Sequence, residues 1–259
     1  MKKLIASIIF LLVLTGSACA LDVSSWNTKN SDHFIVYYRN APSDYVDRVI
    51  ATAESCYTNI DDKLGFTRFD NFWTWDKRVS IYLFDNEVHY SIYSGQPTWS
   101  VAGTESRNRR IYTFVSMNNF FEGVLPHEIC HIIFYDFVLS KKAIPLWMLE
   151  GIACYVEKSG HEERLKLARE YARSGIFISL GGLSNVNRLN DSVDPSLFYS
   201  ESAAVVEFLI DKYGKSRFFD FCRGLRDLRP DEGWSVALKN CYGFKDISEL
   251  FAAYIRYIS

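Results

Sequence analysis

The chain lacks the charge imbalance that marks proteins that bind nucleic acids. Its 29 Lys and Arg residues against 31 Asp and Glu residues leave a formal net charge of −2. A phosphate backbone requires a basic surface, so we expect no nucleic-acid partner. The sequence also has no stretch approaching the roughly 18 uninterrupted apolar residues of a membrane helix. The mature chain is therefore expected to contain no transmembrane span.

Other absences narrow the class of protein further. There is no internal repeat, low-complexity tract or long run of like charges, and none of the six cysteines belongs to a CxxC zinc pair. The 259 residues, of which 48% are hydrophobic and 23% charged, suffice for one large core or two lobes. These features fit a folded enzyme better than a repeat or linker protein.

The N-terminus has the three parts of a secretory signal peptide. The basic pair Lys2-Lys3 precedes an apolar stretch, Leu4–Leu14, and Ala18-Cys19-Ala20 has the small-residue pattern of a cleavage site. We favour cleavage after Ala20. The alternative is a lipoprotein anchored through Cys19, although Gly16 stands where a lipobox has a large aliphatic residue. Both interpretations place the protein outside the cytoplasm, secreted or periplasmic.

Export affects the interpretation of the cysteines, because disulfides persist in oxidising compartments. Removal of Cys19 with the signal peptide leaves five cysteines, an odd number. The first candidates for a disulfide are Cys222 and Cys241, on two successive predicted helices, with Cys130 and Cys154 as a second possibility. For Cys56 a small buried hydrophobic side chain is the better prediction.

The order of the predicted elements indicates an α+β fold. Apolar, β-branched segments predict strands over 33–39, 78–84 and 110–115, and the segment 89–104 is expected to be loop with at most a short strand. Helical periodicity predicts helices over 44–64, 127–138, 146–158, 195–213, 215–228, 232–242 and 246–258. Strands thus dominate the first half and helices the second.

The helix that begins near residue 127 has an unusual start. Asn119 and Glu122 have the spacing of a capping box, but Pro126 would interrupt a helix already under way. Two alternatives follow: the helix begins near Pro126, or it bends there.

The most informative motif is HExxH, formed by His127, Glu128 and His131. Residues i and i+4 of a helix lie on the same face, so the two imidazoles can hold one zinc ion. The glutamate between them is then placed to act as a general base toward water at the metal. The sequence predicts a zinc site with Glu128 as a catalytic residue.

A second motif, Trp147-Met148-Leu149-Glu150-Gly151-Ile152-Ala153-Cys154-Tyr155, follows on the next predicted helix. HExxH followed by W-x-x-E-G-x-A-x-Y resembles the gluzincin zinc metallopeptidases, in particular the peptidase MA-like group. The resemblance implies that Glu150, nineteen residues after His131, is the third zinc ligand. It also implies a thermolysin-like fold with an N-terminal mixed-sheet lobe and a helical C-terminal lobe.

The sequence departs from the family pattern at one position, and the resemblance suggests one further site residue. Thermolysin-like enzymes have an aspartate one turn after the ligand glutamate, which holds a zinc histidine, whereas Cys154, a weak acceptor, stands here. Glu157, or a backbone carbonyl, is the expected substitute. Related enzymes often stabilise the oxyanion with a tyrosine, and Tyr199 is our candidate. The alternative is that Tyr199 only packs against helix 146–158.

The expected function is that of an exported zinc metallopeptidase, with residues 1–20 as signal peptide and 21–259 as one catalytic domain. Within it, 21–175 would form the sheet lobe with the zinc helices and 176–259 the helical lobe. The resemblance suggests strand 110–115 as a sheet edge that holds an extended peptide substrate. Two alternatives are a zinc-retaining envelope assembly protein without protease activity and a zinc amidase acting on a cell-wall amide.

Overall fold

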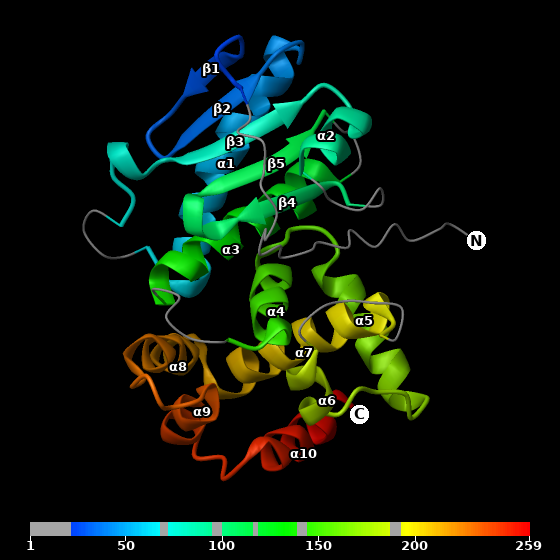
Figure 1. Cartoon of the computed structure of the whole chain (residues 1–259). Coiled ribbons are helices and arrows are strands. Elements are labelled where there is room, and N and C mark those ends of the chain that lie inside the picture. Colours follow the sequence, from blue (N-terminus) through cyan, green and yellow to red (C-terminus); the bar gives the residue numbers. More distant parts are fainter. Residues whose placement is uncertain (1–21, 68–71, 95–99, 116–118, 139–143, 187–192) are drawn as a thin grey trace. The chain divides into compact units, whose positions relative to one another are not determined.

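The computed structural model describes residues 22–67, 72–94, 100–115, 119–138, 144–186 and 193–259 (Figure 1). The predicted signal peptide and Cys19 lie outside the described residues. The chain divides into two compact units. Of the described residues, those up to Asp62 and from Thr67 to Ile133 form the first unit, and Lys63–Phe66 with Phe134–Ser259 form the second. The division into lobes 21–175 and 176–259 stays a prediction from the family resemblance.

The first unit contains a mixed sheet with the strand order β1-β2-β3-β5-β4. The described strands are β1 (Asn27–Asn30), β2 (Phe34–Tyr38), β3 (Val79–Phe84), β4 (Ala102–Glu105) and β5 (Arg110–Phe114). The three central strands run parallel, and both outer strands pair antiparallel to their neighbours. The strands predicted over 33–39, 78–84 and 110–115 are confirmed, and the α+β class with them.

The sheet edge differs from the prediction. Strand β5, proposed as the edge, pairs with β3 on one side and β4 on the other, so β4 forms the edge on this side of the sheet. Its sequence, AGTE, is too short and too polar to show the alternation that identifies a strand. The segment predicted as loop also contains helix α2 (Glu87–Ser94).

The two faces of the sheet differ in what they carry. On one face Val79, Ile81 and Leu83 are fully buried, as central parallel strands require. On the other face Tyr37, Tyr82 and Tyr112 occupy the same register position on three neighbouring strands. Their rings stack with centroids 5.0 and 5.1 Å apart, and such cross-strand aromatic pairs stabilise the sheet beyond simple burial.

Helix α1 (Ser43–Leu64) matches the predicted helix 44–64 within one residue. The apolar stripe of this helix is buried, including Val46, Val49 and Ala53. Spacing of three and four residues places these side chains on one side of the helix. The apolar spacing is the local reason that the segment is helical, and burial of the stripe stabilises the helix.

Helix α3 (Leu125–Val138) follows a short π-helix, Phe120–Val124, and has Pro126 in its first turn. This confirms the alternative in which the α-helix begins near the proline. The capping box is wrong: Asn119 adopts a left-handed backbone conformation and makes no side-chain cap. Its carbonyl instead accepts hydrogen bonds from the N–H groups of Gly123 and Val124. A Cβ at Gly123 would collide with the Asn119 side chain.

The second unit is helical in its described part. It contains α4 (Leu146–Val156), α5 (His161–Arg173), α6 (Leu180–Asn185), α7 (Pro195–Tyr213), α8 (Lys215–Asp227), α9 (Trp234–Tyr242) and α10 (Ile247–Ile258). The predicted C-terminal helices are confirmed to within a few residues at each end. Nowhere in the described chain is a helix both long enough and apolar enough for a membrane crossing.

Helices α4 and α7 approach each other closely at Gly151. A Cβ at this position would collide with the carbonyl oxygen of Ser202 and lie 2.7 Å from Cγ2 of Val206. Only glycine therefore allows the two backbones to come this near. The close approach explains why the motif on α4 contains a glycine directly after Glu150.

A buried ion pair joins the end of α4 to α5. Glu157 is buried, and Nη2 of Arg164 lies 3.1 and 3.0 Å from its two carboxylate oxygens. Gly160, between the two residues, has φ of 93°, a left-handed conformation that turns the chain back toward α5. The sequence pattern suggested Glu157 but not its partner.

The predicted disulfide between Cys222 and Cys241 is wrong, because no disulfide joins the five described cysteines. Cys222 is fully buried on α8, whereas the Cys241 thiol donates a hydrogen bond to the carbonyl of Arg217, 3.1 Å away. The two side chains thus face different surroundings on their helices. Cys56 is buried, as predicted.

Glu201 on α7 is a buried carboxyl group that ties the segment before α6 to this helix. Both of its oxygens accept the N–H of Ile178, at 3.0 and 3.1 Å. Burial raises the pKa of Glu201 to about 8, against the lowering effect of the Ile178 hydrogen bond. The folded protein therefore holds this proton at pH values where the unfolded chain has lost it.

We predict that the loss of Arg164 strongly destabilises the protein. Arg164→Met leaves a buried carboxylate without its cation and should cost about 3–5 kcal/mol in the free energy of unfolding. Arg169→Met, on the exposed side of the same helix, is the matched control and should cost little. The double variant Arg164→Met/Glu157→Met should recover most of the loss in denaturant unfolding. No recovery in the double variant would contradict the proposed energetic coupling.

We predict that Glu201 makes stability fall as the pH rises from about 4.5 to 8. In this window the unfolded chain binds fewer protons at this site than the folded protein, so deprotonation favours unfolding. Glu201→Gln cannot ionise, so its thermal midpoint relative to the wild type should rise by several degrees between pH 5 and pH 8.5. Parallel pH dependence of the two midpoints would contradict this prediction.

Candidate active site

The two histidines of the HExxH motif lie side by side on α3. Their ring centroids are 4.7 Å apart with an interplanar angle of 77°, and both side chains are buried. The i and i+4 positions of a regular helix produce this arrangement directly. Two buried imidazoles on one helical face fit the donor set of a transition metal such as zinc.

Glu128 lies between these histidines in the sequence and is fully buried. Its Oε2 atom accepts a hydrogen bond from the hydroxyl of Thr104 on β4. The sheet edge and the N-terminal turn of α3 are thus joined at the predicted catalytic carboxylate. Thr104 has no signal in the local sequence pattern, because 24 positions separate it from Glu128.

A second buried hydrogen-bond chain holds the start of β4. The hydroxyl groups of Tyr90 and Ser100 are 2.9 Å apart, and Ser100 donates to the carbonyl of Ala102 at 2.8 Å. Burial raises the pKa of Tyr90 above its usual range, and the negative charge of Glu128 raises it further. Tyr90 therefore stays a neutral donor that fixes the edge strand near Glu128.

The remaining predicted ligand and its neighbours belong to the second unit. Glu150 and Cys154 lie one turn apart on α4, Glu157 follows directly after the end of this helix, and all three are buried. In the first unit His127 and His131 offer two buried imidazoles, and in the second unit Glu150 offers a buried carboxylate, so each of the three can serve as a metal ligand. The donor chemistry, two imidazoles and one carboxylate, fits a catalytic zinc site, which has three protein ligands.

Tyr199 lies in the first turns of α7 and is almost completely buried. Its ring contacts Phe198 edge to face, and the guanidinium carbon of Arg164 lies 5.7 Å from the ring centroid. Arg164 is therefore close to both Glu157 and Tyr199. The sequence motifs point to Glu157 and Tyr199 but give no sign of Arg164, the cation that lies near both.

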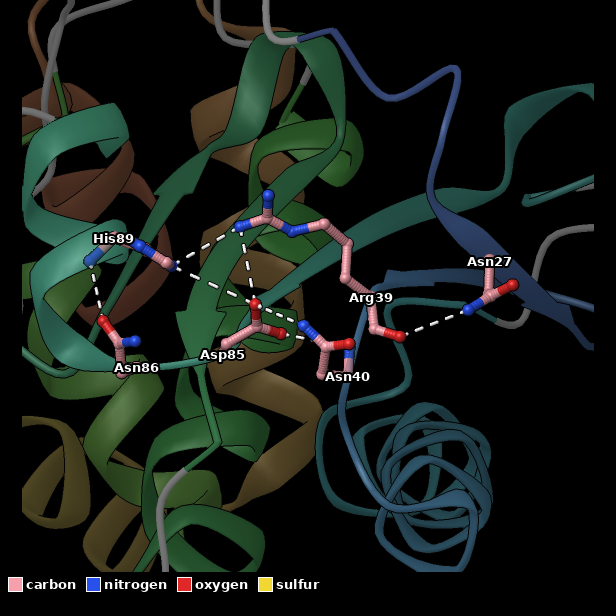
Figure 2. A network of polar contacts seen from close by, with 6 residues as sticks. All are labelled: Asn27, Arg39, Asn40, Asp85, Asn86 and His89. Carbon is pink, nitrogen blue, oxygen red and sulfur yellow. Dashed lines mark hydrogen bonds and ion pairs between the residues drawn. The ribbon is translucent and has the colours of Figure 1, made fainter.

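His89 participates in a polar network in the first unit, at the ends of β2 and β3 (Figure 2). Asp85 accepts hydrogen bonds from the backbone and side-chain nitrogens of Asn40, both at 3.1 Å, and pairs with Arg39 at 3.5 Å. His89 Nδ1 lies 3.4 Å from Arg39 Nη2. This network ties the strand ends to α2, and it accounts for His89 without a catalytic role.

The other two histidines also have partners of their own. His33 Nδ1 lies 2.7 Å from Glu54 Oε2, and His161 Nε2 lies 3.2 Å from Glu207 Oε2. Each of these pairs stays within one unit. These partners account for His33 and His161, which leaves His127 and His131 as the histidines of the HExxH motif.

The comparisons with known proteins identify the family of the chain. A family model described as the Peptidase MA superfamily matches residues 73–258. A comparison with curated proteins finds no match. The matched region includes the HExxH helix, the α4 motif with Glu150, and Tyr199. It also covers well over half of the 259 residues, so the chain belongs to the Peptidase MA superfamily.

Proposed function

We propose that this protein is an exported zinc metallopeptidase of the gluzincin type. The observation that carries the proposal is the pair of buried histidines on α3 with Glu128 between them, in a chain of the Peptidase MA superfamily. This superfamily supports metallopeptidase activity on a peptide substrate. Export rests on the N-terminal signal pattern, and the thermolysin-like arrangement of the lobes rests on the two motifs.

The proposed ligand set is His127, His131 and Glu150, with one zinc ion. A bound zinc ion supplies Lewis acidity, which acidifies water and polarises a carbonyl. Glu150 adds an anionic oxygen to the two neutral imidazoles and leaves a fourth position open, as catalytic zinc sites require. Glu157, or Cys154 as a weaker acceptor, would orient a ligand histidine through its second N–H.

Glu128 is the proposed general base and acid. Its carboxylate takes the proton of the attacking water and returns it to the leaving amine nitrogen of the cleaved peptide. Tyr199 is the proposed donor to the developing oxyanion, since a phenol donates a hydrogen bond without changing protonation near neutral pH. The presence of Glu128 argues against a purely structural zinc site, which needs no base.

The edge strand β4 is the proposed place for an extended peptide. The structure pairs β4 with β5 alone among the described strands, so its outer side can pair with a substrate by main-chain hydrogen bonds. Thr104, which holds Glu128, lies on the same strand. A peptide bound along β4 would thus run beside the proposed base.

We predict one zinc ion per chain in the purified protein. His131→Ala removes one of three ligands and should lose the metal, as measured by elemental analysis after dialysis. His89→Ala is the matched control, because His89 belongs to the separate polar network, and should retain zinc. Full zinc occupancy in His131→Ala would remove the HExxH histidines from the ligand set.

We also predict that Glu128→Gln keeps zinc and the fold but loses peptide hydrolysis. The amide cannot accept the proton of water, and the loss should be on the order of 10²–10⁴-fold in kcat. Glu122→Gln, an exposed position just before α3, serves as the control and should cleave normally. The substrate is a peptide that the wild-type protein cleaves, found by peptide-library digestion. Wild-type turnover by Glu128→Gln would refute the assignment of the base.

A further inference from the structure

Edge strand β4 is held in place by buried hydroxyl groups, and one of them contacts the proposed base. Thr104 is 6% exposed and donates its hydroxyl hydrogen to Oε2 of Glu128, which is 0% exposed. Thr113 on β5 donates to the carbonyl of Val101 at 2.9 Å, and Ser100 donates to that of Ala102. Both of these bonds end on the backbone. Thr104 therefore differs from its neighbours in its acceptor, a carboxylate.

We propose that Thr104 is a positioning residue that orients the carboxylate of Glu128 for proton transfer. This inference rests on the proposed function of Glu128 and adds a residue that neither the sequence motifs nor the family match assigns. Thr104 acts through Glu128 and needs no contact with the substrate.

The geometry gives a physical reason for this role. A carboxylate turns about its terminal bond with little preference for one angle, and a hydrogen bond to one oxygen restricts that rotation. With Oε2 held by Thr104, the other oxygen, Oε1, keeps one direction for receiving a proton. Proton transfer depends on such alignment.

The donor itself is rigid. Threonine is β-branched and restricted at χ1, and its strand is paired with β5 through Thr104 opposite Ile111. The chain from Tyr90 through Ser100 to Ala102 holds the preceding residues of the same strand. The hydroxyl position is therefore set by the sheet and does not depend on a flexible side chain.

The test compares Thr104→Val with Thr104→Ser and the control Thr113→Val. Valine keeps the shape of threonine and removes the donor, whereas serine keeps the donor. Thr104→Val should lower kcat by about 10–100-fold with KM within about 2-fold of the wild type. Thr104→Ser should restore kcat to within about 3-fold, and Thr113→Val should leave kcat unchanged. Zinc content should equal that of the wild type in all three variants.

A second measurement uses the metal-free protein and does not depend on activity. Thr104→Val should lower the thermal midpoint when Glu128 is present, since a buried carboxylate then loses its donor. In the Glu128→Leu background the same change should raise the midpoint or leave it unaltered, because the hydroxyl has lost its acceptor. Thr113→Val should lower the midpoint equally in both backgrounds. If Thr104→Val fails to fold, Thr104→Ala replaces it.

The outcomes separate the two proposals. If Glu128→Gln is inactive while Thr104→Val turns over at the wild-type rate, the positioning role is overturned and the proposed function stands. Equal midpoint changes for Thr104→Val in both backgrounds would also overturn the positioning role. If Glu128→Gln retains full turnover, the proposed function fails, and the positioning role fails with it.

Discussion

A buried carboxylate is unstable unless something replaces the water that it has lost. The cost of burying an isolated charge is several kcal/mol even after relaxation, and donors, cations or metals must offset it. Glu128, Glu150, Glu157 and Glu201 are all buried in this protein. The groups that contact these carboxyl groups show how their burial is compensated.

Each compensation uses a different kind of chemistry. Glu128 receives the hydroxyl hydrogen of Thr104, and Glu157 faces the guanidinium of Arg164. Among the described residues, Glu201 accepts a hydrogen bond from the N–H of Ile178, and burial raises its pKa to about 8, so the group keeps its proton. For Glu150 we propose the metal. These differences match the different roles that we propose: a base must be ionised and aligned, a ligand must be anionic, and a neutral carboxyl can serve as a structural tie.

Local sequence was sufficient for some elements and insufficient for others. The HExxH histidines lie side by side because i and i+4 positions do so in any regular helix, and α1 followed from its apolar stripe. The prediction allowed for a short strand within 89–104 but did not place it, because the four residues of β4, AGTE, carry no alternation, and the position of β4 at the edge depends on pairing with β5. The predicted capping box at Asn119 is wrong because the backbone of Asn119 has a left-handed conformation. The predicted disulfide is wrong because the Cys241 thiol is directed toward the carbonyl of Arg217. Sequence spacing does not report how a helix is oriented about its own axis.

The sequence by itself determined the spacing of His127, Glu128 and His131, the glutamate motif on the next helix and the α+β order of elements. All of these depend on residues within a few turns of each other. Only the tertiary structure decided which strand forms the sheet edge, which hydroxyl meets Glu128 and which cation meets Glu157. Those partners come from separate elements, and a hydrogen bond or ion pair forms only after packing has brought the elements together. The sequence pattern therefore identified the chemical groups, and packing selected the neighbours that orient them.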